Sequence, residues 1–567
     1  MMDMLVRNIS LLTLLFCSQV FAQFHDPRAL EANPLLADSP IAPRLEGLGD
    51  VGFKVTTGNA DSQYYFNQGL RLTYAFNHSE ALRAFKESAR LDPDNAMAWW
   101  GQALVLGPNI NLPMMPYVTD AAWAAMQEAT ARQSPATKKE KALIAALAQR
   151  YRPEVSANRI ELDRAYADAM LKLAGEYASD PDIAALTASA LMNLSPWDYW
   201  FGDGKPYERT VVIMALLEGA IAKSPKHTGA LHYHIHVTES KEPDLGEPSA
   251  DALKDLAPGA GHLLHMPSHI YMRVGRYADA YAMNQAATKA DVDYIAQCQA
   301  QGLYPVGYYP HNAHFMVWSA QFMGRYADAI AAARDIRDKI PEFIGVEDQL
   351  PTNVKSDAWV MFETFLSQPL FTMTRFGDWE AVLEEPKPDK SALFMTGIWH
   401  YARGMARVHT GQPEAARMER ESLRRILVKS DIDNYAVSLN GAKRLLEIAE
   451  KLLSGEIAAS NGNYERAIAL MSGAVRLQDG LLYMEPPDWF FPSRHYLGAV
   501  LLEAGKADEA ETVYWADLSR NPENGFALFG LMQAQTEMGN AEAADLSRMR
   551  FERAWINADV ELANSRF

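Results

Sequence analysis

Histidine is concentrated in one part of this 567-residue sequence, between residues 227 and 314. Neutral imidazole is the commonest protein ligand of transition metals, and it can also donate hydrogen bonds with a charge that varies with pH. Nine of the fourteen histidines lie in this stretch: His227, His232, His234, His236, His262, His265, His269, His311 and His314. The stretch is therefore the first candidate for chemistry in the chain.

The spacing of these histidines is typical of ligands that share one face of a helix. His232 and His236 are four residues apart, as are His265 and His269. Residues three or four apart lie on the same side of a helix. We predict eight metal ligands: His232, His236, Glu239, His262, His265, His269, His311 and His314. Imidazole with one carboxylate suits Zn, Cu or Fe better than Ca or Mg, and eight candidates leave room for a second metal or for histidines that orient the ligands.

Three interpretations of the histidine pattern compete. The first is a transition-metal site. The second is a groove that binds an anionic ligand or an acidic peptide through histidine donors. The third is structural, with histidines hydrogen-bonded between helices. Several histidines in one helical register favour the metal site.

The sequence leaves open whether such a metal would be catalytic. Neither histidine pair has glutamate directly after its first histidine, so the zinc-protease helix motif is absent, and no nucleophile elbow, Walker loop or dinucleotide fingerprint occurs. His227 is either a ligand or a helix cap, or has no special role. The segment Tyr304–Tyr309 and His495 could add to a site, and the reactivity of Cys298 is open.

Charge and composition exclude some partners. The formal net charge is −18, which repels nucleic acid and weakly favours cations.

Residues 1–22 are predicted to be an export signal, with Arg7 before an apolar core and cleavage after Ala22. We therefore expect a periplasmic or secreted protein. No later apolar run is long enough for a transmembrane helix, and Cys298 would be the only cysteine left in the mature chain.

The elements that must position the histidines follow a repeat pattern. Gly-x-aromatic-x-x-Ala turns begin at Gly275, Gly324 and Gly462, and Gly505 and Gly539 are 34 residues apart. An earlier unit places packing residues at Tyr65, Gly69, Leu72, Ala81, Phe85 and Pro93. Over most of residues 61 to 550 the sequence resembles tetratricopeptide repeat proteins. The resemblance implies an all-α, tetratricopeptide-type superhelix, a right-handed solenoid of helical hairpins.

We divide the chain accordingly. The predicted segments are an export signal (1–22), an irregular arm (23–60), N-terminal repeats (61–125), divergent helical hairpins (126–215), a histidine-rich module (216–345), further repeats (346–450), C-terminal repeats (451–550) and a tail (551–567).

The resemblance also implies where the histidines point. In tetratricopeptide proteins the stripe that would carry the eight candidates lines a concave groove, whereas His234 falls off the stripe and is expected in the core or behind a ligand. We therefore expect an exported repeat protein that binds a transition metal in its groove, with catalysis left open. The alternative is a non-catalytic scaffold whose groove binds a peptide or protein partner. The sequence does not indicate an oligomeric state.

Overall fold

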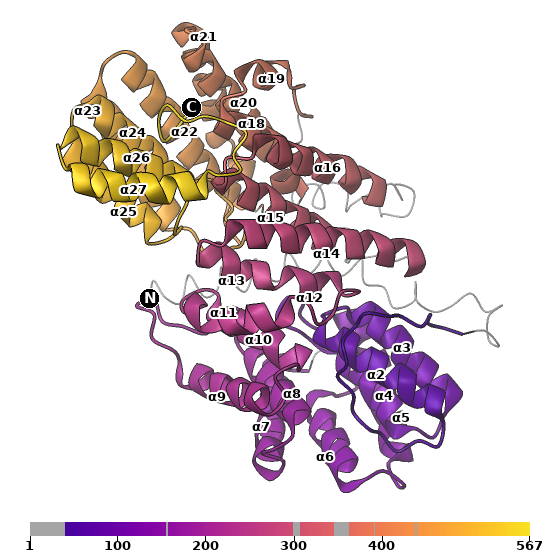
Figure 1. Ribbon diagram of the computed structural model, residues 1–567. Coiled ribbons are helices and arrows are strands. Elements are labelled where there is room, and N and C mark those ends of the chain that lie inside the picture. The colour runs from indigo at the N-terminus through magenta and orange to yellow at the C-terminus, as the bar shows by residue number, and fades with distance from the viewer. Residues whose placement is uncertain are drawn as a thin grey trace. The chain divides into compact units, whose positions relative to one another are not determined.

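The computed structural model describes residues 40–154, 157–298, 307–344, 362–389, 392–435, 437 and 439–567. The predicted export signal, residues 23–39 of the predicted arm and Tyr304 lie outside these residues. Within them the regular structure is helical, apart from two isolated β-bridges at Asn109–Leu112 and Trp200–Pro206 (Figure 1). None of these helices is both long enough and apolar enough to cross a bilayer.

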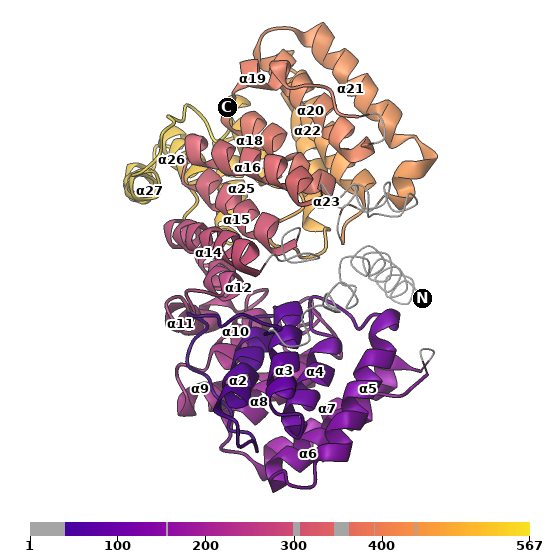
Figure 2. The same cartoon turned by 90° about the vertical axis from the view of Figure 1, so that its right-hand side faces the viewer.

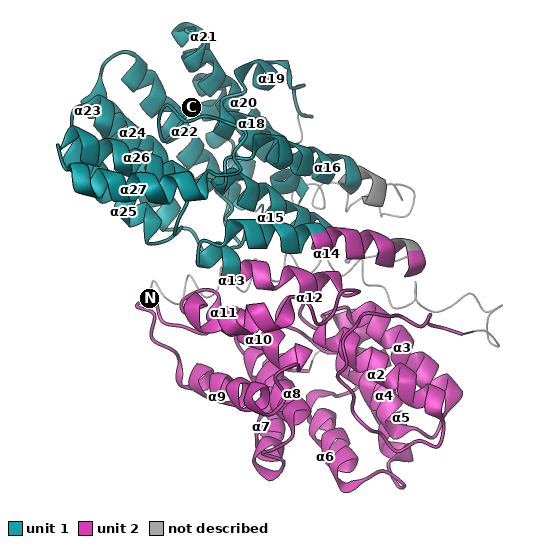
Figure 3. Cartoon of the chain, in the orientation of Figure 1, with its two compact units in different colours: residues 1–20, 271–285, 309–567 teal, residues 21–270, 286–308 magenta. Residues whose placement is uncertain are grey.

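The chain forms two compact units, shown in two colours in Figure 3. In its described part, unit 2 comprises the chain up to Ile270 together with residues 286–308, and unit 1 comprises Tyr271–Gln285 and Tyr309–Phe567. Helices α13 (Pro267–Arg273) and α14 (Tyr277–Cys298) each contribute residues to both units. The finer segment boundaries predicted from the sequence stay predictions.

Unit 2 is built from consecutive helices that pack on their neighbours. Its helices are α2 (Ala60–Tyr74), α3 (His78–Leu91), α4 (Ala96–Leu106), α5 (Thr119–Arg132), α6 (Lys138–Leu147), α7 (Arg159–Glu176), α8 (Pro181–Met192), α9 (Glu208–Lys223), α10 (Thr228–Thr238), α11 (Pro243–Leu253) and α12 (Gly261–His265), with short 3₁₀ turns η2 (Pro116–Val118) and η3 (Ala148–Arg150). Helices α2, α3 and α4 lie side by side (Figures 1 and 2). A Cβ on Gly69 or Gly101 would lie 2.7 or 2.4 Å from the Phe85 ring, so these glycines permit the close helix approach.

Unit 1 repeats a helix–turn–helix pattern. Its helices are α15 (Tyr309–Phe322), α16 (Tyr326–Ile344), α18 (Gln368–Phe376), α19 (Trp379–Glu384), α20 (Leu393–His409), α21 (Pro413–Leu427), α22 (Ala442–Ser460), α23 (Tyr464–Asp479), α24 (Ser493–Glu503), α25 (Ala507–Leu518), α26 (Gly525–Glu537) and α27 (Ala541–Ala554), with the 3₁₀ turn η5 (Ser430–Asn434). The turn glycines all have φ between 69° and 81°, the left-handed region open to glycine. They are Gly275, Gly324, Gly377, Gly411, Gly462, Gly505 and Gly539. The predicted all-α, tetratricopeptide-type fold is confirmed.

Candidate metal centre

Helix α10 carries the first candidate ligands through the middle of unit 2. It contacts α2, α8, α9 and α11, and every one of its residues is buried. His227 caps its N-terminus, because His227 Nδ1 accepts a hydrogen bond from the Ala230 N–H at 3.1 Å and His227 Nε2 lies 3.1 Å from Asp182 Oδ1. The sequence left three roles open for His227, as a ligand, as a cap or with no special role, and in the structure it is a cap.

Three histidines of unit 2 come together as one cluster. One ring nitrogen from each of His232, His236 and His262 lies within 4.8 Å of the other two. The first two residues come from successive turns of α10, and His262 comes from α12. Nitrogen ligands about 2.1 Å from a zinc ion in tetrahedral geometry lie roughly 3.4 Å apart. Small side-chain rotations would therefore bring the three nitrogens to coordination distance.

The protonation of His232 suits a metal ligand. Its Nδ1–H donates to the carbonyl oxygen of Tyr74 at 2.6 Å, which leaves Nε2 unprotonated and without a hydrogen-bond partner among the described residues. Burial lowers the pKa of His232 to about 3, so the ring is neutral at ordinary pH. Histidine ligands commonly donate their second ring N–H to a carbonyl or carboxylate, which fixes the tautomer and the ring orientation.

His262 has no hydrogen-bond partner at either ring nitrogen among the described residues, although only 3% of its surface is exposed. Burial lowers the pKa of His262 well below its ordinary value, and the neighbouring histidines lower it further. Buried polar atoms in native proteins nearly always have a partner, and each exception needs an explanation such as an ion or an ordered water. A metal ion among these rings would supply that partner.

The remaining unit 2 candidates extend the cluster. Glu239 Oε2 lies 3.4 Å from His236 Nδ1 and 3.5 Å from His269 Nδ1, and its side chain is 1% exposed. His265 and His269 approach each other at 2.8 Å between their Nε2 atoms, so one of the two nitrogens carries the proton. Six of the eight predicted ligands thus form one chain of contacts in unit 2.

The other two candidates belong to α15 of unit 1. His311 packs edge-on against Phe315, with ring centroids 5.1 Å apart. His314 stacks on Phe490 at 4.9 Å, and burial lowers its pKa to about 3. The structure therefore brings together six predicted ligands, and these two lie within unit 1.

Two histidines outside the predicted ligand set have defined packing roles. His234 Nδ1 and the Ser249 hydroxyl are hydrogen-bonded at 2.9 Å, which agrees with the expected place of His234 in the core. His495 is fully buried in unit 1 between the guanidinium of Arg375, 2.6 Å from Nδ1, and the carboxylate of Asp517, 2.8 Å from Nε2. It therefore links two buried charges.

Aromatic side chains cover the histidine cluster, and of the three described here only Tyr308 belongs to a segment, Tyr304–Tyr309, that the sequence suggested could add to a site. Phe76 contacts His232, His236 and His262, with ring centroids 4.5, 5.7 and 5.6 Å apart. Trp197 packs edge-on against His236 at 5.0 Å, and Tyr308 packs against His262 at 4.8 Å. The cluster is therefore buried under aromatic rings rather than open to solvent, although the stripe had been expected to line a groove.

Phe76 and Trp197 also share an uncommon backbone conformation. Their φ angles are 54° and 65°, and among the described residues only one other non-glycine residue has a positive φ. Bulky side chains rarely adopt this region, and such residues persist where the surrounding structure holds them. Phe76 precedes the N-cap of α3 as Gly505 precedes the N-cap of α25, so it stands where other turns carry glycine. In the sequence, the signal for this residue is a phenylalanine at a turn position where the other turns carry glycine.

No family model and no curated protein matches this sequence. Among solved structures, the human IFIT1 dimer with m7Gppp-AAAA is 13% identical and has a TM-score of 0.28, with 89% of this chain and 92% of that chain covered. Yeast Tom70 is 12% identical with a TM-score of 0.27 and coverages of 88% and 91%. The P58(IPK) TPR domain is 13% identical with a TM-score of 0.22 and coverages of 85% and 99%. Nothing about the histidine cluster follows from these likenesses.

Proposed function

We propose that the protein binds one transition-metal ion through His232, His236 and His262 in unit 2. The observation that supports this most directly is the convergence of three buried imidazoles within 4.8 Å. In the part of the chain that the structure describes, His232 Nε2 and both ring nitrogens of His262 have no hydrogen-bond partner, and both rings are neutral. Neutral imidazole with a free lone pair is the form that binds a metal.

The donor set favours Zn, Cu or Fe over Ca or Mg, because three of its members are imidazoles. Glu239 is close enough to His236 to orient it or to act as a fourth ligand. Three protein ligands with a remaining position are typical of catalytic zinc, whereas four close the site. The role of Glu239 therefore decides between a metalloenzyme and a metal-stabilised binding protein.

A peptide or protein partner remains the alternative function, and it is proposed from the repeat fold alone. Such a partner would use a surface other than the six clustered side chains of unit 2, because these are buried. We also propose, from the first 22 residues, that the protein is exported, so that it would meet its metal outside the cytoplasm.

The test is metal analysis of the purified chain without a polyhistidine tag. We expect about one equivalent of a transition metal after reconstitution and dialysis. We expect loss of that metal in His232→Gln and His262→Gln, which keep side-chain volume but remove the ligand. The matched control is His400→Gln in unit 1, and we expect this variant to retain the metal bound in unit 2. A protein that takes up no metal, or a His232→Gln, His262→Gln double variant that retains it, would show the proposal to be wrong.

A further inference from the structure

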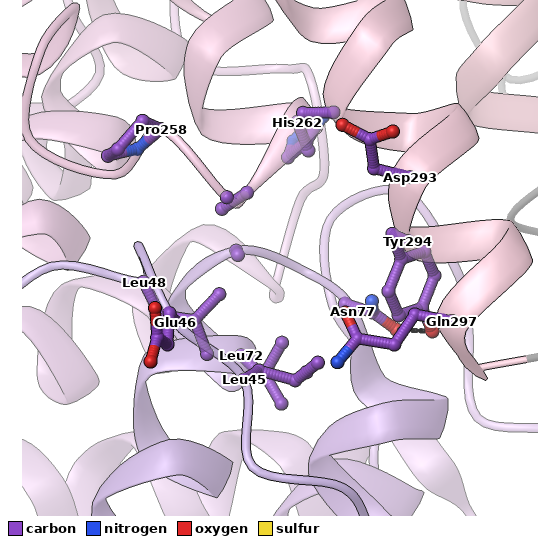
Figure 4. Close-up of a pocket in the computed structure, with 14 residues that line it drawn as sticks. Leu45, Glu46, Leu48, Leu72, Asn77, Pro258, His262, Asp293, Tyr294 and Gln297 are labelled. Atoms are coloured by element: carbon purple, nitrogen blue, oxygen red, sulfur yellow. Dashed lines mark hydrogen bonds between the residues drawn. The ribbon is translucent and has the colours of Figure 1, made fainter.

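A cavity of about 120 Å³ in unit 2 has His262 in its wall (Figure 4). It lies between the segment around Glu46, the end of α2, the loop before α12 and the part of α14 around Asp293. A cavity needs only about 10 to 15 Å³ to admit one water molecule, so this cavity has room for several waters. A metal ion with part of its hydration shell could therefore enter it.

The polar groups of the cavity suit a cation. Among the described residues that line it, Glu46 and Asp293 are carboxylates and none is lysine or arginine. Asn77 and Tyr294 add neutral oxygen atoms, with the Tyr294 hydroxyl donating to Asn77 Oδ1 at 3.3 Å. The remainder of the wall is mainly aliphatic, so it offers no competing anion site.

One positive charge outside the cavity wall weakens the attraction of the cavity for a cation. Lys289 lies on α14, as Asp293 does, and forms an exposed ion pair with Asp293 at 2.6 Å. Exposed pairs of this kind are weak and are screened by salt, so Asp293 keeps part of its attraction for a cation. Removing the charge of Lys289 would therefore make the potential at the cavity more negative, whereas removing the charges of Glu46 and Asp293 would make it less negative.

His262 connects the cavity to the metal centre. It belongs both to the cavity wall and to the triad with His232 and His236, and its ring nitrogens have no hydrogen-bond partner among the described residues. The triad also packs against the rings of Phe76, Trp197 and Tyr308, none of which lines the cavity. An ion that reaches the triad through the cavity would therefore meet His262 first.

We propose that this cavity is the route by which a hydrated divalent cation reaches the histidine triad, attracted by Glu46 and Asp293 and received by His262. The proposal rests on the metal-binding function proposed above and adds its route of loading. A route has a kinetic signature, because it sets the rates of loading and release without changing the final complex.

The test is stopped-flow binding of Co²⁺ alone to the metal-free full-length protein, followed by visible absorption. Ala290 lines the cavity, and we expect Ala290→Phe to slow both association and dissociation about tenfold or more, with unchanged equilibrium affinity. At low ionic strength we expect Glu46→Gln, Asp293→Asn to slow association by roughly threefold to tenfold and Lys289→Gln to accelerate it. At high salt these charge effects shrink.

The matched control for charge is Asp50→Asn, Asp255→Asn, which removes two exposed carboxylates of unit 2 outside the cavity and is expected to leave the association rate within about twofold of wild type. Wild-type rates in Ala290→Phe, or equal slowing by the control and by Glu46→Gln, Asp293→Asn, would overturn the route while leaving the metal site in place. A wild-type protein that binds no Co²⁺ or Zn²⁺ at equilibrium would instead remove the proposed function itself, and the route with it.

Discussion

Phe76 offers a test of the link between backbone strain and the metal centre. Its side chain is 5% exposed and packs on three imidazoles, so truncation to alanine would cost about 3 to 5 kcal/mol. Its φ of 54° costs a non-glycine residue roughly 1 to 2 kcal/mol, which glycine avoids. Glycine loses about 0.5 to 1 kcal/mol more chain entropy on folding. We therefore expect Phe76→Gly to be more stable than Phe76→Ala by about 0.5 to 1 kcal/mol.

The matched control is Phe85, which is also fully buried but lies inside helix α3. There the order reverses, and Phe85→Ala is expected to be more stable than Phe85→Gly by about 1 kcal/mol. The measurement is urea unfolding of the metal-free protein, read by hydrogen exchange in α2 and α3, because a chain of two units need not unfold in one step. Equal or reversed stabilities at Phe76 would refute the strained turn.

The same variants test the cover over the histidines. Removing the Phe76 ring exposes the triad to water, so we expect metal to dissociate at least several-fold faster from Phe76→Ala than from wild type. A chelator competition measures that rate. An unchanged rate would show that the ring stabilises the fold but does not shield the metal.

Three further predictions concern buried groups. Burial raises the pKa of Glu363 to about 7, above its ordinary 4.5. The unfolding free energy of unit 1 is therefore expected to fall by up to about 3 kcal/mol as the pH rises from 4.5 to 7. Urea unfolding measures this pH dependence, which we expect Glu363→Gln to remove. Asp517→Asn removes the buried carboxylate that faces the guanidinium of Arg375 across the His495 ring, and it is expected to cost about 3 kcal/mol. A double-mutant cycle with Arg375→Met is expected to give less than the sum of the two single costs. A Cβ on Gly229 would lie 2.3 Å from the Tyr74 ring, so Gly229→Ala is expected to cost about 1 to 3 kcal/mol of stability. Because the Tyr74 carbonyl orients the His232 ring, the same variant is expected to bind Zn²⁺ more weakly in titrations.

The sequence predicted the fold well because the repeat signal is local. A glycine such as Gly505 is favoured where the chain takes a left-handed turn between two helices, and seven such turns carry glycine in the sequence. The spacing of His232 and His236 likewise predicted their shared helix face, because helical periodicity is a property of the chain alone.

The rest of the site depends on contacts between distant segments. Phe76 and Trp197 cover the histidines from two separate turns and Tyr308 from the helical residues just before α15. The sequence marks the Phe76 turn and the Tyr304–Tyr309 segment as unusual, but it does not indicate that these three rings meet over the histidines. The hydrogen bond from His232 to the Tyr74 carbonyl joins residues 158 positions apart. Long-range packing of this kind decides tautomer, burial and pKa, which is why the sequence predicted the candidate ligands but not their chemical state.

The energetics of the metal-free cluster support a bound ion. A buried polar atom left without a hydrogen bond costs about 1 to 3 kcal/mol, and His232 and His262 together present three such nitrogens. Phe76 adds backbone strain at the same place. A typical domain is stable by only about 5 to 15 kcal/mol, so these costs form a large share of what unit 2 has to offset. A metal ion would satisfy His232 Nε2 and one ring nitrogen of His262, the other nitrogen of that ring carrying its proton, and structural zinc contributes on the order of 10 kcal/mol in small domains. The cost of the histidine cluster is therefore easiest to understand if unit 2 reaches its full stability only with the metal bound.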